Sequence, residues 1–188
     1  MHLDDCVAKY NCLQPMINKL TWEIAPKNSL LQFKTKWFGI SSIAGQFSKF
    51  HAIVKADQFF SNPEIHLLIE TGSAETPDEK WNKYLRASEF LAAESFPYIE
   101  FASVGGCRQQ SGKIWELTGD LSIKGTTKSL TMIVNLSDIK KEKKKTTAVF
   151  HLFGTISRKD FALHCPQEED IADEVQLNAI ITLTSIEE

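Results

Sequence analysis

The chain lacks the short motifs around which most catalytic sites are built. We find no G-x-S-x-G nucleophile elbow, no H-E-x-x-H metal helix, no phosphate-binding loop and no dinucleotide-binding glycine pattern. Its five histidines are scattered over the 188 residues, at positions 2, 51, 66, 151 and 164. We therefore predict that the protein is not an enzyme, that it has no catalytic residues, and that it uses no cofactor.

Cysteine is scarce, and its spacing excludes the usual metal sites. The four cysteines are Cys6, Cys12, Cys107 and Cys165. They contain no C-x-x-C pair and no Cys/His spacing of a zinc site. His164 adjoins Cys165, but neighbouring residues of a strand point to opposite faces. We predict no bound metal.

Long apolar runs are also missing. No stretch approaches the roughly 18 apolar residues of a membrane-spanning helix, and Leu13–Leu20 is interrupted by proline and polar residues. The first residues are acidic, where a secretion signal needs positive charge. This pattern favours a cytoplasmic protein with reduced thiols. The alternative is a periplasmic protein from which a leader has been removed.

Positive and negative side chains nearly balance each other, and the formal net charge is −3. No basic face interleaved with aromatic residues is present, so we predict no nucleic-acid partner. The one basic run, Lys140–Lys145, lies between two strand patterns. Its simplest interpretation is a solvated hairpin loop, and the alternative is contact with an anionic membrane surface.

What the chain does contain is strict alternation of apolar and polar residues. From Trp115 to Val134, two alternating runs flank Gly125, which is typical of half-buried antiparallel strands joined by a tight turn. Leu31–Trp37 and Ile65–Ile69 alternate in the same way. A sheet with one apolar face must bury that face, and closure into a barrel also removes exposed edges. The pattern predicts a single all-β domain.

Nine strands are predicted from these runs. They are Thr21–Ala25, Leu30–Phe38, Gln46–Lys55, Glu64–Glu70, Tyr98–Cys107, Lys113–Ile123, Leu130–Ser137, Thr147–Ser157 and Val175–Ser185. Residues 1–19 precede them as an N-terminal extension with weak signals for order.

One helical insert is expected between the fourth and fifth strands, at Pro77–Leu85. Thr76 is the predicted N-cap, with Pro77 at the first helical position and Glu79 completing a capping box. Trp81, Tyr84 and Leu85 then share one face. That face either plugs one end of the barrel or covers the mouth of a ligand cavity. A second short turn is expected between Ser88 and Pro97.

Several segments resemble motifs of the YceI-like family. Gly119–Leu130 resembles G-x-L-T-I-x-G-x-T-K-x-V, Gly45–Phe50 resembles G-x-F-x-x-F, Phe96–Ser103 resembles Y-P-x-x-x-F-x-S, and Ile156–Phe161 resembles I-x-R-x-D-F. They follow the family's order and spacing from about Leu20 to Ile186.

The resemblance implies an up-and-down, antiparallel, lipocalin-like β-barrel of about eight strands over residues 20–188, with a short helical insert. It also implies a binding module for a long isoprenoid or fatty-acyl chain, used in transport or storage, and a homodimer. From the residues alone, aromatic side chains inside the barrel fit a solid core equally well. The alternative is therefore a structural or interaction module with a filled barrel.

Residues at inward-facing strand positions and on the helix face are the predicted tunnel lining. They are Phe33, Trp37, Phe47, Ile65, Leu67, Trp81, Tyr84, Phe101, Leu117, Leu121, Met132 and Val134.

Polar residues at the predicted tunnel mouth are the candidates for contact with a head group. They are Asn28, Asn82, Arg86, Lys128 and Arg158. The sequence departs from the family here, because Asn28, Trp37 and Tyr84 stand where the family has histidine. We therefore expect binding to depend little on pH between about 5 and 8, where imidazole titrates. The alternatives are a structural bridge from Arg158 to a neighbouring carboxylate and a solvated Lys128.

Overall fold

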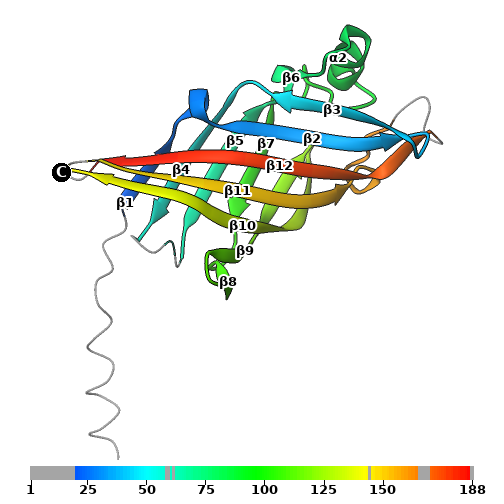
Figure 1. The fold of residues 1–188 in the computed structure, drawn as a ribbon. Helices are drawn as coiled ribbons and strands as arrows, with labels where there is room; N and C mark the ends of the chain where they lie inside the picture. The colour runs from blue at the N-terminus through cyan, green and yellow to red at the C-terminus, as the bar shows by residue number, and fades with distance from the viewer. Residues whose placement is uncertain (1–19, 58–59, 61, 144, 165–169, 187–188) are drawn as a thin grey trace, which may run out of the picture.

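A computed structural model describes residues 20–57, 60, 62–143, 145–164 and 170–186, which form one antiparallel sheet closed into a barrel (Figure 1). The strands are β1 (Leu20–Ile24), β2 (Leu30–Trp37), β3 (Ser41–Phe47), β4 (Phe50–Ala56), β5 (Glu64–Glu70), β6 (Ala74–Glu75), β7 (Tyr98–Ser103), β8 (Arg108–Ser111), β9 (Ile114–Ile123), β10 (Thr126–Glu142), β11 (Lys145–Ser157) and β12 (Ile171–Ile186). The helical elements are η1 (Pro26–Asn28), η2 (Thr71–Ser73), α2 (Glu79–Arg86) and η3 (Lys159–Phe161).

Eight of these strands close the barrel in the order β1-β4-β5-β7-β9-β10-β11-β12, and β12 pairs again with β1. The predicted all-β, lipocalin-like barrel of about eight strands is therefore confirmed. The predicted extension, residues 1–19, lies outside the described residues.

Along one of its two edges, the long strand β12 pairs with two strands in succession. Its end around Leu183 pairs with β1, and its preceding half pairs with β2, with η1 at the bend between them. Beyond β2 the sheet continues through β3 to the short β6. Residues of β3, α2 and the turns that follow α2 line one cavity together.

The predicted strand Gln46–Lys55 was wrong, because the structure has two strands there. β3 pairs with β2 and β6, whereas β4 pairs with β1 and β5. The chain changes partners at Ser48 and Lys49, where the Ser73 hydroxyl accepts a hydrogen bond from the Lys49 N–H at 3.1 Å. Phe47 and Phe50 both belong to the apolar core cluster although their positions differ by three, which would place them on opposite faces of one continuous strand. The side-chain alternation is therefore reset at this point.

The helix α2 begins two residues later than predicted, and its N-cap is Asp78 rather than Thr76. The Asp78 Oδ1 accepts a hydrogen bond from the Lys80 N–H at 2.9 Å. The Thr76 hydroxyl instead bonds to Asn82 Oδ1 at 3.1 Å and to the Asp78 carbonyl at 2.9 Å. Thr76 and Asp78 are both residue types that cap helices, so residue type alone does not select between them.

The basic run Lys140–Lys145 lies where β10 turns into β11. Strand pairing continues to Glu142 and Lys145, so both strands reach further into the run than predicted. The described residues of the run are exposed, as expected for a solvated hairpin.

Candidate ligand-binding cavities

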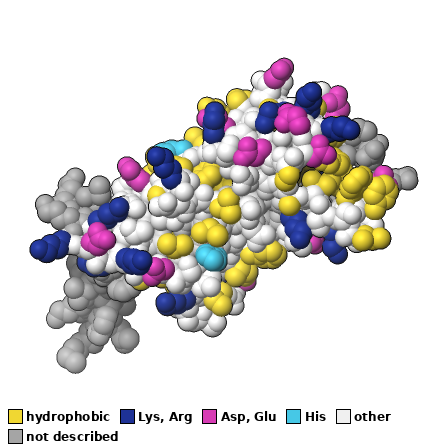
Figure 2. Space-filling view, turned by 45° about the horizontal axis from the view of Figure 1, so that its top comes forward, with side chains coloured by type: hydrophobic (Ala, Val, Ile, Leu, Met, Phe, Trp, Pro, Cys, Tyr) yellow, Lys and Arg dark blue, Asp and Glu magenta, His cyan; other side chains and the backbone are white. Residues whose placement is uncertain are grey.

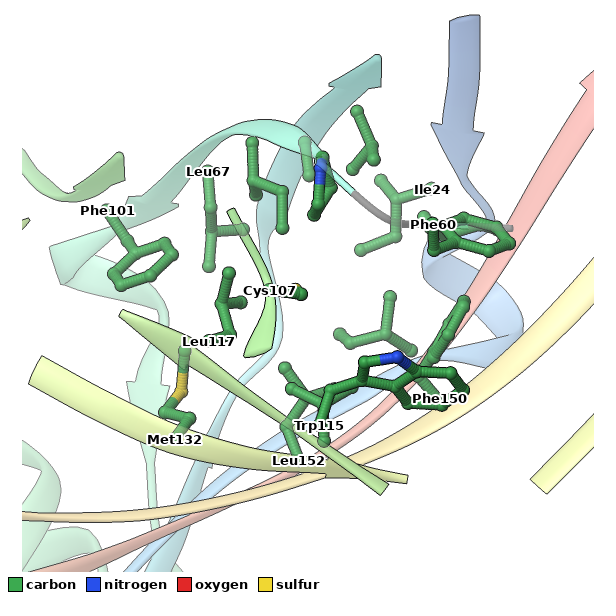
Figure 3. Close-up of a pocket in the computed structure, with 17 residues that line it drawn as sticks. Ile24, Phe60, Leu67, Phe101, Cys107, Trp115, Leu117, Met132, Phe150 and Leu152 are labelled. Carbon is green, nitrogen blue, oxygen red and sulfur yellow. The ribbon is translucent and has the colours of Figure 1, made fainter. Parts of the chain in front are cut away.

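Two cavities lie inside the barrel. The Trp115 cavity has a volume of about 100 Å³ and is drawn in Figure 3. Its wall consists of Ile24, Ala52, Val54, Phe60, Pro63, Ile65, Leu67, Phe101, Cys107, Trp115, Leu117, Met132, Val134, Phe150, Leu152, Ile181 and Leu183. Every one of these side chains is apolar or, for Cys107, nearly so.

The second cavity, which we call the Trp81 cavity, has a volume of about 130 Å³. It is lined by Phe33, Thr35, Ile43, Phe47, Ile69, Trp81, Tyr84, Leu85, Phe90, Leu91, Ile99, Leu121, Ile123, Ile156, Arg158, Leu163, Ile171, Val175 and Leu177. The space itself is bounded by apolar surface.

The two cavities lie end to end along the barrel, because the same strands line both. In β9, Leu117 faces the Trp115 cavity and Leu121 faces the Trp81 cavity, with Gly119 between them. In β12, Ile181 lines the Trp115 cavity and Leu177 lines the Trp81 cavity. Alternate residues of a strand share a face, so consecutive inward positions step along the barrel interior.

A waist separates the cavities where two glycines lie opposite large side chains. A Cβ atom at Gly119 would lie 2.6 Å from Phe101 Cε2, and one at Gly154 would lie 2.9 Å from Met132 Cγ. Phe101 and Met132 therefore occupy the interior space that side chains at 119 and 154 would need. The ring of Phe101 and the side chain of Met132 contribute to this waist.

The helix α2 covers the Trp81 cavity with the face that the sequence predicted. Trp81, Tyr84 and Leu85 all line the cavity, and Leu85 is buried. The ring of Tyr84 packs against the ring of Phe90, with the two centroids 6.2 Å apart. Asn82 is buried beside Thr76 and accepts a hydrogen bond from the Thr76 N–H at 2.6 Å, which holds the start of the helix.

Arg158 brings a positive charge into the wall of the Trp81 cavity. It is only 1% exposed and donates hydrogen bonds to the carbonyl oxygens of Leu163 and Ile171, at 3.0 and 3.2 Å, and of Ala172 at 3.3 Å. These carbonyls compensate part of the cost of burying the guanidinium. These contacts favour a structural role for Arg158.

Asp173 lies close to this guanidinium and carries a shifted pKa. Burial by itself raises the pKa, but hydrogen bonds from the Lys159 N–H at 3.0 Å and the Ser157 hydroxyl at 2.8 Å lower it. The charges of Lys159 and Arg158 act in the same direction. The net effect is a pKa for Asp173 below its ordinary value, so this carboxylate is ionised at neutral pH.

The structure brings eleven of the twelve predicted tunnel residues to a cavity wall. Ile65, Leu67, Phe101, Leu117, Met132 and Val134 line the Trp115 cavity, and Phe33, Phe47, Trp81, Tyr84 and Leu121 line the Trp81 cavity. Trp37 instead packs with Ile43 and Ile171 at the border of the Trp81 cavity. Contact of these residues with a ligand stays a prediction.

The five predicted mouth residues are not brought together. Only Arg158 lines a cavity. Asn28 is exposed in η1, where its carbonyl accepts a hydrogen bond from Thr182 Oγ1 at 2.8 Å. Arg86 is exposed and donates to the Ala74 carbonyl at 3.1 Å. Lys128 is exposed near the start of β10, and Asn82 serves the helix cap described above.

Two cavity residues, Phe60 and Cys107, lie outside the alternating strand cores. Phe60 lies in the connection after β4, where its N–H donates to the Asp57 carbonyl at 3.1 Å, and no periodicity in that loop indicates an inward side chain. Cys107 was placed in a predicted strand that in fact ends at Ser103. Burial in the cavity wall raises the pKa of the Cys107 thiol to about 11.

The chain matches the YceI-like domain over residues 22–183. The protein belongs to the YceI-like family. This family membership accounts for the barrel, the covering helix and the order of the sequence motifs together.

Bacterial relatives share about three residues in ten with this chain over the matched stretches. The chain is 31% identical over 103 residues to a UPF0312 protein of Shewanella denitrificans, covering 54% of this chain and 53% of that protein. It is 29% identical over 141 residues to a UPF0312 protein of Enterobacter sp. strain 638, covering 72% and 70%. The matched part thus spans about half the length of the Shewanella relative.

Solved structures of YceI-like proteins share the fold. BcnA of Burkholderia cenocepacia superposes with a TM-score of 0.73 at 23% identity, covering 85% of this chain and 98% of that one. A polyisoprenoid binding domain from Saccharophagus degradans, implicated in plant cell wall breakdown, superposes with a TM-score of 0.67 at 12% identity, covering 88% and 99%. At these identities the likeness concerns the fold alone.

Within the described part of this YceI-like chain, no group of three His, Cys, Asp or Glu side chains is placed to hold a metal ion. Among the same residues, no helix has the length and apolar character needed to cross a membrane.

Proposed function

We propose that this YceI-like protein binds a long-chain lipid, of the isoprenoid or fatty-acyl class, inside its barrel. The observation that carries the proposal is the pair of apolar cavities that lie end to end within one closed barrel. Their linear arrangement suits a slim chain better than a compact ligand. The description of the Saccharophagus relative as a polyisoprenoid binding domain supports the same ligand class.

The cavity sizes indicate how such a chain would be held. An apolar protein cavity of about 150 Å³ accommodates benzene, so each cavity, at about 100 and 130 Å³, holds only a short piece of a chain. A long ligand therefore has to pass the waist at Phe101 and occupy both cavities. In this proposal Phe101 rotates aside when the chain enters.

The apolar walls determine where the affinity comes from. Burial contributes ~0.8 kcal/mol per methylene before the costs of ordering the chain. No histidine lines either cavity within the described residues, so binding varies little between about pH 5 and 8. Lengthening an acyl ligand by two carbons then tightens binding more than replacing its carboxylate by an alcohol. Arg158 carries the positive charge among the described lining residues, and it would favour an anionic head group that entered the Trp81 cavity.

The test is titration with a fluorescent fatty acid or polyprenol, using two variants of adjacent residues. Leu67 faces the Trp115 cavity, whereas Leu68 is 42% exposed on the outer face of the same strand. Leu67→Trp fills the cavity and is expected to weaken saturable binding, and Leu68→Trp is expected to leave it unchanged. Native mass spectrometry after gentle extraction would identify a co-purified lipid.

A barrel that shows no saturable binding would instead favour the alternative, an interaction module. One observation supports that alternative, namely the exposed apolar patch formed by Ile133, Phe153 and Ile180 on adjacent strands. A shallow surface depression lies over the same residues. We further propose that the protein forms a homodimer, that it transports or stores the lipid, and that it has no enzymatic activity. Light scattering tests the dimer directly.

A further inference from the structure

The hairpin between β2 and β3 ends in an exposed apolar turn. Phe38 is 59% exposed and Ile40 is 93% exposed. The Ile40 N–H donates to the Trp37 carbonyl at 3.3 Å and closes the turn. The turn projects at one end of the barrel (Figure 1), and Figure 2 shows hydrophobic side chains gathered at that end. We call residues Trp37–Ile40 the apolar tip.

The backbone of the apolar tip is unfavourable for the residues it contains. Phe38 and Gly39 have φ angles of 51° and 68°. Trp37–Ile40 form a β-turn, closed by the Ile40 N–H to the Trp37 carbonyl, within a three-residue connection. A β-turn with positive φ at both central positions favours Asn-Gly, and a bulky side chain such as Phe is strained there. Phe38 is thus strained and also largely exposed, so neither turn formation nor core packing accounts for its presence. Such an outlier points to a role in contact with another molecule.

A continuous series of aromatic rings connects the apolar tip with the Trp81 cavity. The ring of Phe38 lies 5.1 Å from that of Trp37, which lies 5.9 Å from Trp81. Trp81 lies 6.1 Å from Tyr84, and Tyr84 lies 6.2 Å from Phe90. The last three residues line the cavity. An apolar chain that left the cavity along these rings would emerge at the tip.

We propose that the apolar tip inserts into the surface of a lipid bilayer and that ligand passes between the bilayer and the Trp81 cavity there. The insertion depends only on the tip, whereas the exchange of ligand rests on the proposed lipid-binding function. A convex tip whose exposed side chains are Phe38 and Ile40 suits the interfacial region of a bilayer, where aromatic and aliphatic side chains are favoured. A long apolar ligand also has its reservoir in the bilayer rather than in water.

The charge distribution indicates that this attachment is hydrophobic rather than electrostatic. Phe38, Gly39 and Ile40 carry no charge, and the formal net charge of the chain is −3. The basic run Lys140–Lys145 lies at the opposite end of the barrel (Figure 1). The apolar tip is therefore expected to bind neutral phosphatidylcholine vesicles and to do so equally well at low and high salt.

Flotation of the full chain with phosphatidylcholine vesicles tests the insertion. The test variant is Phe38→Asn combined with Ile40→Ser, because Asn-Gly is the sequence that this turn prefers and the variant should fold. The control is Phe153→Asn, which removes a 46% exposed side chain from the barrel wall. We expect the double variant to partition into vesicles roughly tenfold less than the wild type or weaker still, and the control to bind like the wild type.

Three results would overturn the proposal. The first is wild-type protein that does not float with neutral vesicles, and the second is a double variant that floats as well as the wild type. The third is attachment only to vesicles with anionic lipid, abolished by salt, which would assign the contact to charged residues such as Lys140. A dimer in light scattering that is lost in the double variant, without vesicle binding, would make the tip a contact between two copies.

Ligand titration separates this proposal from the function on which it partly rests. With a fluorescent fatty acid delivered in solution, the double variant is expected to keep wild-type affinity because its cavities are unchanged. Transfer of the same ligand from vesicles is expected to slow in the double variant alone. If neither protein binds the fatty acid, the lipid-binding function fails, while the flotation result still decides whether the tip enters a bilayer.

Discussion

The ring of Phe101 in β7 occupies the space that a side chain on Gly119 in β9 would need. A Cβ atom at Gly119 would lie 2.6 Å from Phe101 Cε2 and 2.5 Å from the Ala102 carbonyl oxygen. The two strands are paired directly, with Phe101 opposite Leu121 and Ser103 opposite Gly119. This close approach lies at the waist between the two cavities, so we expect the sizes of both residues to influence how far the internal space extends.

A methyl group at Gly119 is expected to overpack the waist. Gly119→Ala should lower the free energy of unfolding by roughly 1–3 kcal/mol, because Phe101 or the β7 backbone has to move. Gly72→Ala is the matched control, since a Cβ atom there meets nothing within 4 Å. Urea unfolding measures both. Equal stability of the two variants would show that the waist yields without cost.

Removal of the Phe101 ring is expected to join the two cavities. Phe101 is buried, so Phe101→Ala should reduce the free energy of unfolding by roughly 3–5 kcal/mol. The enlarged space should improve the binding of longer acyl chains relative to shorter ones, which a chain-length series in fluorescence displacement measures. Phe153→Ala, at an exposed position, should change neither quantity appreciably. An unchanged chain-length preference would mean that Phe101 does not divide the ligand site.

The Cys107 thiol should make stability depend on alkaline pH. Burial raises its pKa from 9.0 to about 11, so the folded protein holds this proton more tightly than the unfolded chain. The resulting contribution is complete below about pH 9 and is lost as pH rises toward 11. Relative to Cys107→Ala, the wild type should therefore lose stability across that interval. Both proteins should carry serine at positions 6, 12 and 165. Parallel stability curves would contradict a buried thiol.

Asp173 should contribute stability at neutral pH but not in acid. Its pKa in the folded state is lowered below the ordinary 3.8, so the folded protein releases this proton more readily than the unfolded chain. The contribution is present above pH 3.8 and disappears as pH falls through the lowered value. Asp173→Asn should accordingly be less stable than the wild type at pH 7, with the difference vanishing in strong acid. Asp120→Asn, at an exposed position of β9, is the control.

Alternation in the sequence was enough to determine most of the barrel. The strand Glu64–Glu70 was predicted to the residue, because its apolar residues alternate with Glu64, His66 and Glu70. The same alternation decides which side chains point inward, since a strand has only two faces. This is why Leu67, Leu117 and Val134 could be assigned to the interior, where they line the Trp115 cavity.

Tertiary pairing decided the features that local pattern left open. Nothing in the run from Gln46 to Lys55 indicates that β3 and β4 have different partners, since partner choice depends on residues distant in the chain. The position of Arg158 was likewise determined by distant groups, because the Ile171 and Ala172 carbonyls that receive its hydrogen bonds come from β12. Its guanidinium could be buried only where those acceptors converge.

The sequence by itself determined an antiparallel barrel with an apolar interior, because two-residue alternation is a local property that each strand carries alone. Only the tertiary structure decided that the interior is divided into two cavities, since the waist requires Phe101 and Gly119 from different strands to meet. It also decided that the exposed Phe38 is connected with the Trp81 cavity through Trp37. Cavities and surfaces arise from packing between segments, which no single segment encodes.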